Sequence, residues 1–307
     1  MEVQAIPTVV RNFRWSDVKA YTALLKSLGE LYGAPESQEQ QVLEYLRQPN
    51  LHPQRDFLLA EAEGALVGYV LISPEAAIGR MVLGVGIHPR YRGQGIGTEL
   101  IGRALEHSKE LGGEVAHAPA SYGNMATRRL LTDMGFKPVR RYWEMRLSDR
   151  IKAPHPQPPE DYHLYSFQPG DEAELTRIQN LSFGASWGFC PNTVEEIRYR
   201  VNMSDSRPEG IIFIARGDRV VGYCWTRRLA RDDKAVGQIS MMGVDPAEQS
   251  RGLGRMVLLG GLTHLRGSGL GVVELTVDGH NQPAIRLYQS VGFRRRAVTL
   301  WYEKRLR

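Results

Sequence analysis

The sequence is poor in cysteine, has few lysines and contains no long apolar run. Its only cysteines, Cys190 and Cys224, are too few for a disulfide framework or a structural zinc site, and free thiols suit a reducing compartment. No apolar run approaches the roughly 18 residues that a membrane span requires, and the first residues do not resemble a secretory signal. We therefore expect a cytoplasmic protein that has no membrane partner.

A large excess of charge of one sign is also absent. The 39 basic residues face 34 acidic ones, and only seven of the basic residues are lysine, so 32 are arginine. Arginine favours phosphate and carboxylate ligands, but a bias toward arginine can equally reflect genome composition. The mild excess suggests an anionic ligand and does not indicate nucleic-acid binding. The eight histidines show no spacing typical of metal ligands, so no metal is predicted.

What the sequence does contain is a repeat. The chain has 307 residues, a comfortable length for two domains of about 150 residues each. Asn124 and Gly135 return 157 positions later as Asn281 and Gly292, and a phenylalanine follows each glycine. Two further segments match: Gly86-Ile87-His88-Pro89 with Gly243-Val244-Asp245-Pro246, and Arg92-Gly93-Gln94-Gly95 with Arg251-Gly252-Leu253-Gly254. The sequence therefore predicts a duplicated domain.

A proline-rich segment separates the two copies. Residues 151–160 contain four prolines, which cannot donate ladder hydrogen bonds and favour an extended chain. We predict that this segment links domains at residues 1–150 and 161–307.

Both copies show the same order of expected elements. A strand and two helices precede a hairpin, and a further strand, a glycine-rich turn, a helix, a strand, a helix and a last hairpin follow. The expected ranges are 3–13, 17 onward, 37–47, 57–61, 66–72, 80–87, 96–105, 115–118 and 124–147 in the first copy, and 162–167, 171–182, 193–201, 211–215, 219–226, 238–244, 254–265, 271–277 and 281–306 in the second. This alternation predicts the α/β class, with a mixed central sheet flanked by helices in each copy.

The glycine-rich turn is the main chemical signal. A strand that enters such a turn and then a helix presents backbone amides and the positive end of the helix dipole to a phosphate. A dinucleotide fingerprint requires a third glycine at positions that Thr98 and Val257 occupy, and a nucleoside-triphosphate loop requires a Gly-Lys-Ser/Thr sequence that the chain lacks. Both of these phosphate-binding motifs are therefore excluded.

The remaining pattern resembles the GNAT acetyltransferase superfamily. It consists of Arg-x-x-Gly-x-Gly after a strand that ends in proline, and of a later helix that reads Asn281-x-x-Ala284-x-x-Leu287-Tyr288-x-x-x-Gly292-Phe293. Both copies look like complete GNAT domains, and the resemblance covers nearly the whole chain except the linker. The tandem arrangement and residues 251–256 are similar to those of mycothiol synthase and its relatives.

The resemblance implies that acetyl-CoA is the co-substrate. Amides of the turn would bind its pyrophosphate, and the preceding strand would pair with its pantetheine arm. The residues implied are Val85, Gly86, Ile87, Arg92, Gly93, Gln94, Gly95, Ile96, Gly97 and Thr98 in the first copy, and Met242, Gly243, Val244, Arg251, Gly252, Leu253, Gly254, Arg255, Met256 and Asn281 in the second. Met256, which this alignment matches to Gly97, would weaken the second turn.

The resemblance also assigns a catalytic acid. Tyr288 occupies the place of the tyrosine that protonates the departing thiolate in the family, whereas the first copy has Leu131 there, which cannot donate a proton. We therefore expect catalysis in the second copy, while the first binds acetyl-CoA without turnover or only supports the fold. Tyr288 also lies on an apolar helical stripe, so core packing is the alternative role.

The sequence identifies the general base and the acceptor site less clearly than the catalytic acid. Gln238 stands where the family often has a glutamate, so a water could relay the proton to Glu274 or Asp278, or the amine could arrive neutral. The segment 182–192 would be the acceptor loop, in which Trp187 and Phe189 would line the acceptor pocket or lock the loop to the core. This loop lacks the His-Pro pattern that we associate with mycothiol synthase. Cys190 is expected to be structural.

The sequence leaves three classes of function open. The leading one is an N-acetyltransferase that acts on a primary amine of a small molecule or peptide. The alternative is a non-catalytic sensor that binds acyl-CoA, because Gln238 and Leu131 depart from the catalytic pattern. A third, a nucleic-acid-associated protein, is suggested by residues 140–141 and 294–296, which are all arginine. A solvated face or contacts with the 3′-phosphate of CoA explain those arginines more simply, so no nucleic-acid partner is predicted.

Overall fold

The protein consists of two compact α/β units. The computed structural model describes residues 7–29, 35–151, 154–231 and 234–307. The first unit comprises Met1–Arg141 and Thr299–Arg307, and the second comprises Tyr142–Val298. Each unit has a mixed sheet with helices packed on it, so the predicted fold class is confirmed.

The first unit follows the predicted order of elements closely. Its strands lie in the order β1-β2-β3-β4-β5-β12, and all neighbours are antiparallel except β4 and β5, which are parallel. One element that the sequence did not predict is the short helix α3. The elements are β1 Thr8–Asn12, α1 Val18–Ser27, α2 Pro35–Leu46, α3 Pro53–Asp56, β2 Phe57–Ala62, β3 Ala65–Glu75, β4 Arg80–Ile87, α4 Ile96–Glu110, β5 Val115–Ser121, α5 Met125–Asp133 and the start of β6 Lys137–Leu147.

The second unit repeats this architecture. Its strands lie in the order β7-β8-β9-β10-β11-β6, and only β10 and β11 are parallel. Its elements are β7 Tyr162–Ser166, α6 Glu172–Phe183, α7 Val194–Val201, β8 Ser206–Arg216, β9 Arg219–Arg231, β10 Lys234–Val244, α8 Leu253–Gly267, β11 Val273–Asp278, α9 Gln282–Val291 and the start of β12 Arg294–Arg305. The proline-rich residues 154–159 form neither helix nor strand.

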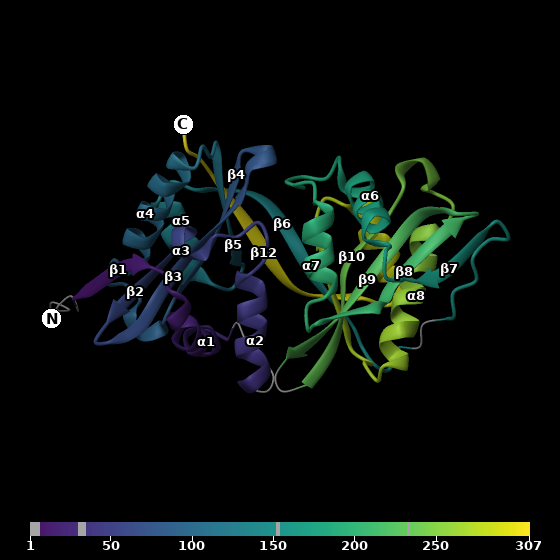
Figure 1. Cartoon of the computed structure of the whole chain (residues 1–307), viewed down its shortest axis with the longest axis horizontal. Helices are drawn as coiled ribbons and strands as arrows, with labels where there is room; N and C mark the ends of the chain where they lie inside the picture. Colours follow the sequence, from purple (N-terminus) through teal and green to yellow (C-terminus); the bar gives the residue numbers. More distant parts are fainter. Residues whose placement is uncertain (1–6, 30–34, 152–153, 232–233) are drawn as a thin grey trace. The chain divides into compact units, whose positions relative to one another are not determined.

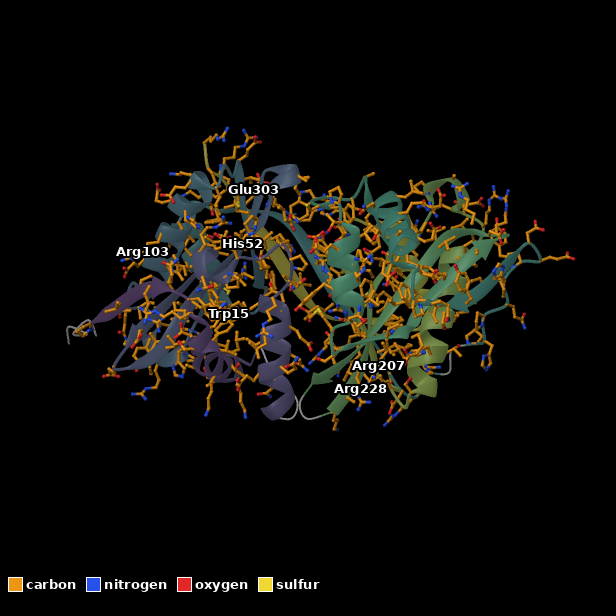
Figure 2. The ribbon with its side chains drawn as sticks, viewed as in Figure 1. Trp15, His52, Arg103, Arg207, Arg228 and Glu303 are labelled. Carbon is orange, nitrogen blue, oxygen red and sulfur yellow. The ribbon has the colours of Figure 1, made fainter. Side chains whose placement is uncertain are left out.

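Each sheet is completed by the last strand of the other repeat. Residues Thr299–Arg305 of β12 pair with β5, beside which the yellow strand lies in Figure 1. His117 Nε2 on β5 lies 3.0 Å from Glu303 Oε2 on β12, and Figure 2 shows Glu303 among the side chains of the first unit. Residues Tyr142–Leu147 of β6 pair in the same way with β11.

This exchange changes two expectations. The units differ from the expected ranges 1–150 and 161–307, because the final strand of each repeat is divided between the units. The expected terminal hairpins are wrong, because β6 and β12 are each one long strand. Each strand extends into the sheet of the other repeat, so no turn is required within it.

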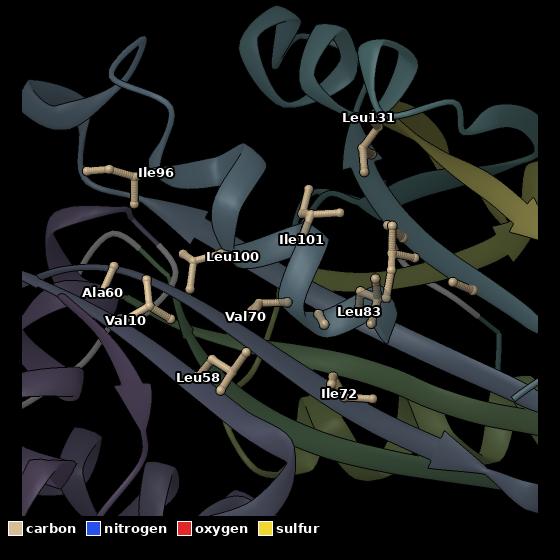
Figure 3. Close-up of a cluster of buried hydrophobic side chains, with 14 of the residues drawn as sticks. Val10, Leu58, Ala60, Val70, Ile72, Leu83, Ile96, Leu100, Ile101 and Leu131 are labelled. Carbon is tan, nitrogen blue, oxygen red and sulfur yellow. The ribbon is translucent and has the colours of Figure 1, made fainter. Parts of the chain in front are cut away.

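The sheet of the first unit separates two apolar layers. Along β3, Val70 and Ile72 face the cluster under α4, whereas Tyr69 and Leu71 face the cluster under α1 and α2. This alternation is the period of two expected of a strand. Figure 3 shows the first cluster, which includes the predicted buried face of α4 (Ile96, Leu100, Ile101 and Leu105) and Leu131 of α5.

A buried carboxylate joins α3 to the end of α4. Asp56 is completely buried, and its Oδ1 lies 2.7 Å from Arg55 Nε and 2.9 Å from His107 Nε2. His107 Nδ1 lies 3.0 Å from Glu110 Oε2. Burial favours the neutral imidazole, but the hydrogen bonds to Glu110 and Asp56 outweigh it and raise the pKa of His107. Protonated His107 therefore stabilises this contact.

We expect the contribution of His107 to stability to fall as pH rises. Because its pKa is raised on folding, the contribution is fully present below the ordinary value of about 6.5 and is lost as pH rises through the folded value. The difference in thermal midpoint between the wild type and His107→Gln should therefore be larger near pH 6 than near pH 9. A difference that does not change between these two conditions would contradict the assignment.

The strand exchange predicts where the chain can be cut. A fragment of residues 142–298 keeps β6 beside β11, and thereby keeps Met145 and Leu147, which are at most 1% exposed. A fragment of residues 161–307 loses both side chains, each worth about 1.5–3 kcal/mol of burial, and leaves the edge of β11 unpaired. We expect cooperative denaturant unfolding of the first fragment and aggregation of the second. Equal behaviour would show that the exchanged strand is dispensable.

Candidate active site

The first unit contains a cleft where its parallel strands separate. β4 and β5 pair over three residue pairs only, and β4 then continues beside β3 alone. The opening is a cleft of about 410 Å³. Its lining includes the predicted residues Val85, Gly86, Ile87, Arg92, Gly93, Gly95, Gly97 and Thr98, and also Asn124, the N-cap of α5, which was not predicted for this site. Of the other predicted residues, Ile96 lies in the core, and the side-chain Nε2 of Gln94 donates to the Arg90 carbonyl at 3.3 Å.

The strands of the second unit separate in the same way, with one difference. β10 and β11 also pair over three residue pairs, and no ladder pairing joins Met242, Gly243 or Val244 to β11 in the described part of the chain. β10 has a register shift against β9 between Ile239 and Met241, whereas β4 runs against β3 without a shift. Such a bulge increases the local twist and re-aims side chains, and bulges are common next to active sites.

The backbone of the two turns corrects the alignment made from sequence. Positive φ angles occur at Gly93 (77°) and Gly95 (83°) in the first turn and at Ser250 (64°) and Gly252 (80°) in the second. Gly95 and Gly252 are the N-cap residues of α4 and α8. Gly252 is therefore equivalent to Gly95, and the offset is 157 residues in the turn as elsewhere. The match of residues 92–95 to 251–254 was two residues out, because Ser250 replaces the first glycine.

The corrected alignment changes the residue equivalent to Gly97. That residue is Gly254, so both helices have a glycine at this position. Met256 is equivalent to Glu99 and packs against the apolar cluster of the second unit. The expectation that Met256 weakens the second turn is therefore wrong.

A side chain at equivalent positions closes each turn. In the first unit Arg92 Nε donates to the Ile87 carbonyl at 3.1 Å, and in the second Gln249 Nε2 donates to the Val244 carbonyl at 3.2 Å. Each bond ties the turn to the last residue of the preceding strand. The sequence analysis missed Gln249, although the constant offset of 157 residues would have identified it.

Both turns leave amides available to an anion. The N-terminal amides of a helix have no partner within the helix. Neither Gly95 nor Gly252 supplies a side-chain cap, and a Cβ atom at Gly93, Gly95 or Gly252 would find nothing within 4 Å. An open turn with unused donors and the positive end of a helix dipole fits the pyrophosphate of acetyl-CoA.

Ion pairs stabilise the residues that precede the second turn. Buried Glu248 accepts hydrogen bonds from Tyr162 (2.9 Å) and Arg216 (3.1 Å), and Arg251 lies 3.4 Å from it. Buried Asp245 accepts a hydrogen bond from Arg219 at 2.7 Å. Each acidic side chain therefore has at least one arginine partner, which reduces its repulsion of a phosphate. The Arg251 side chain is directed to Glu248.

The structure places the proposed acid, Tyr288, on α9. The Asn281 side chain caps this helix by accepting from the Ala284 amide at 3.1 Å, as Asn124 caps α5 by accepting from Thr127. Tyr288 is 7% exposed, and burial, with a smaller effect of the nearby Cys224, raises its pKa. Its hydroxyl forms no hydrogen bond with the residues that the structure describes. A phenol in such surroundings requires a polar partner.

The carboxylates considered as bases already form ion pairs or hydrogen bonds with other residues of the chain. Gln238 is in register with Glu274 across β10 and β11. Glu274 Oε1 lies 2.6 Å from Arg146 Nη2 and 2.7 Å from Arg296 Nη1. Asp278 Oδ1 accepts from the backbone amide of His280 at 2.9 Å and holds the loop before α9. Both carboxylates therefore have structural contacts, and the identity of the base does not follow from them.

The expected acceptor loop between α6 and α7 is anchored at its far end. The Asn192 amide donates to Asn180 Oδ1 at 2.9 Å, and Asn180 Nδ2 donates to the Asn192 carbonyl at 3.0 Å. The side chain of Asn192 accepts from Arg200 at 2.7 Å and donates to Gln179 at 3.3 Å. These bonds use both backbone and side-chain groups of Asn192, so this residue fixes the end of the loop.

Aromatic contacts fix the rest of this loop. Phe189 stacks on Phe183 with ring centroids 5.6 Å apart, and Trp187 lies 6.5 Å from Tyr142. Trp187, Phe189 and Cys190 are half-buried, whereas Cys224 is completely buried. Phe189 therefore packs against another residue of the loop, Phe183. Trp187, the other residue predicted to contact the acceptor, lies next to Tyr142 of the exchanged strand β6.

The described ranges contain neither a cluster of metal-ligating side chains nor a helix that could span a membrane. No group of three or more histidine, cysteine, aspartate or glutamate side chains there is arranged to hold a metal ion. No helix in the same ranges combines the length and the apolar character needed to cross a bilayer.

Comparison with known proteins agrees with this geometry. The family model described as the acetyltransferase (GNAT) family matches residues 21–136 and 173–293. A mycothiol acetyltransferase of Thermobispora bispora is 32% identical to this chain over 94% of the chain and 96% of its own length. The mycothiol acetyltransferase of Nocardia farcinica is 34% identical over 77% of the chain and 78% of its own length.

Solved structures show the same tandem fold. A GCN5-related N-acetyltransferase from Sphaerobacter thermophilus has a TM-score of 0.74 at 23% identity, covering 98% of this chain and 97% of its own. A tandem GNAT protein from the clavulanic acid biosynthesis pathway also has a TM-score of 0.74, at 17% identity, covering 98% of this chain and 99% of its own. At these identities the likeness concerns the fold.

The role of Asn192 can be tested without knowledge of the acceptor. Replacing it by alanine removes two side-chain hydrogen bonds, each worth about 1 kcal/mol. We expect chymotrypsin to cleave native Asn192→Ala after Trp187 or Phe189 about thirtyfold faster than the wild type. Asn202→Ala is the control, because Asn202 bonds the Arg198 carbonyl at the other end of α7. Equal cleavage of the two variants would show that Asn192 does not anchor the loop.

Proposed function

Because the chain belongs to the GNAT family of acetyltransferases, we propose that its second unit transfers the acetyl group of acetyl-CoA to a primary amine. The resemblance to mycothiol acetyltransferases extends along nearly the whole chain and favours a small-molecule acceptor of the kind their name indicates over a peptide. Trp187 and Phe189, on the anchored loop, are the proposed acceptor contacts. We also propose a cytoplasmic location, with which two free cysteines are consistent.

Two differences between the units support the assignment of catalysis to the second, and Tyr288 carries it. Both units have an open turn that follows a strand, β4 or β10, and in both units this strand separates from its parallel neighbour. Only the second also has a bulge in that strand and a tyrosine, Tyr288, on the helix beside it. The equivalent Leu131 is completely buried in the apolar cluster of the first unit. The second unit therefore has a proton donor that the first lacks.

The backbone of the second unit would hold acetyl-CoA. Met242, Gly243 and Val244 have a strand edge that is not used by β11, which an extended pantetheine arm can join as an added strand. The amides from Ser250 to Gly254 would hold the pyrophosphate. When bound, acetyl-CoA supplies a thioester whose carbonyl oxygen gains negative charge and whose thiolate leaves.

Tyr288 would donate a hydrogen bond to the departing sulfur. Its raised pKa keeps the phenol protonated throughout the physiological range, so a proton is available at all working pH values. A phenol whose pKa lies above that of a thiol, about 8.5, stays protonated and donates a charge-assisted hydrogen bond to the developing thiolate. Such donation is worth about 10²–10⁴ in rate.

The first unit has the features of a binding unit. Its cleft of about 410 Å³ is lined by eight of the ten residues that the resemblance implies for acetyl-CoA. We propose that it holds acetyl-CoA without transferring the acetyl group, because Leu131 offers no proton. The non-catalytic acyl-CoA-binding role considered from sequence would thus apply to the first unit, whereas the second unit both binds acetyl-CoA and transfers its acetyl group.

Replacing Tyr288 by phenylalanine tests the assignment directly. We expect kcat for amine-dependent release of CoA thiol to fall about 10²–10⁴-fold, with the fold and the affinity for CoA unchanged. The matched control is Tyr302→Phe, since Tyr302 is a buried tyrosine whose hydroxyl accepts from Arg128 at 3.3 Å in the first unit. If Tyr288→Phe turns over as fast as this control, Tyr288 is a packing residue.

A further inference from the structure

Each exchanged strand brings a charged side chain to the strand that it joins. Glu303 of β12 lies opposite His117 of β5, and its Oε2 lies 3.0 Å from His117 Nε2. Arg146 of β6 lies opposite Glu274 of β11, and its Nη2 lies 2.6 Å from Glu274 Oε1. Glu303 is equivalent to Arg146 by the constant offset of 157 residues, and the receiving residues are equivalent in the same way. The carboxylate is therefore on the arriving strand in the first unit and on the receiving strand in the second.

These charges oppose the pairing of either strand with the sheet of its own repeat. In the first unit, burial and the charge of nearby Arg80 lower the pKa of His117. Arg146 would meet a cation in that place and would lose its carboxylate partner. In the second unit, Glu303 would lie opposite the carboxylate of Glu274. Like charges directly opposite each other on neighbouring strands are destabilising, so the charges favour the exchange that the structure shows.

The other face of each strand is matched by size. Tyr302 of β12 lies opposite Ala118 of β5. Met145 of β6 lies opposite Leu275 of β11, and all four side chains are at most 3% exposed. Paired with the sheet of its own repeat, Tyr302 would meet Leu275 and overpack the core. Met145 would meet Ala118 and leave a cavity, and both changes destabilise a core.

A hydrogen bond adds to this match. The Tyr302 hydroxyl accepts from Arg128 Nε at 3.3 Å in the first unit. The residue equivalent to Arg128 in the second unit is Ile285, which is 2% exposed and has no polar side-chain atom. In the sheet of the second unit the hydroxyl would lose this partner, and a buried hydroxyl without a partner is unfavourable. Charge, size and this bond therefore distinguish the two strands in the same direction.

We propose that the edges of β5 and β11 are docking surfaces, each selective for the strand of the other repeat. The edge of β5 accepts a strand with a carboxylate and a tyrosine, and the edge of β11 accepts one with an arginine and a methionine. Because β6 and β12 each continue without a turn, a strand can reach the sheet of its own repeat only in a second copy of the chain. The selection therefore disfavours dimers in which like repeats of two copies exchange strands.

The experiment exchanges the two strand charges in the full chain. The variant Arg146→Glu/Glu303→Arg keeps the composition and the net charge, but each strand then matches the edge of its own repeat. We expect its urea midpoint of unfolding to fall by about 0.5 M or more. After refolding at high concentration, light scattering should show a larger proportion of dimers and larger assemblies than for the wild type. Glu106→Lys/Lys109→Glu, which exchanges the charges of an exposed pair on α4, is the matched control and should leave both readings close to those of the wild type.

A second variant tests whether the charges act through the docking contact. Glu303→Arg alone should lower the urea midpoint. Adding His117→Glu should restore most of this loss, because the new carboxylate would face the new guanidinium across β5 and β12. The rescue is measured at this edge because Arg296 also lies 2.7 Å from Glu274 at the other edge.

Two results would overturn the proposal. If Arg146→Glu/Glu303→Arg has the urea midpoint and the mass of the wild type, the edges do not select their strands by charge. If His117→Glu restores none of the stability lost in Glu303→Arg, Glu303 acts through contacts other than the docking contact. Both readings are made without acetyl-CoA, so they do not depend on the proposed function.

Discussion

The site depends on the early separation of one parallel strand pair. In both units the fourth and fifth strands pair over three residue pairs and then diverge, so one edge of β4 or β10 carries backbone groups with no ladder partner among the strands that the structure describes. Unpaired backbone groups are costly unless water or a ligand satisfies them. The glycine turn and the start of α4 or α8 follow at the end of that edge. A ligand with an amide-containing arm and a pyrophosphate can satisfy both sets of groups at once.

The duplication shows which parts of this arrangement belong to the fold and which to the chemistry. Both units keep the glycine at the N-cap, the side chain that closes the turn and the asparagine that caps the next helix. They differ at the bulge in β10, at Tyr288 against Leu131, and at the arginines that follow Phe293. In the proposed function the common features hold acetyl-CoA, and the bulge and Tyr288 serve the transfer of its acetyl group.

Local patterns made much of the fold predictable. β4 spans Arg80–Ile87 as expected, and the apolar face of α4 is buried as its spacing predicted, because both patterns are set by neighbouring residues. The exchange of β6 and β12 was not predictable, because the alternation of residues 142–147 is the same whichever sheet receives the strand. The turn alignment failed at Ser250, a residue in a conformation that sequence comparison expects of glycine. The base stays unassigned, since Glu274 and Asp278 have structural partners that their sequence context does not reveal.

In the proposed function both units hold acetyl-CoA and only the second transfers its acetyl group. A single-turnover experiment distinguishes the two units. The chain is first saturated with labelled acetyl-CoA, and the amine acceptor is then added with an excess of unlabelled acetyl-CoA. We expect about half of the bound label to be transferred in one fast phase and the rest to exchange unreacted into solution. Transfer of nearly all bound label in that phase, or binding of a single equivalent, would contradict it.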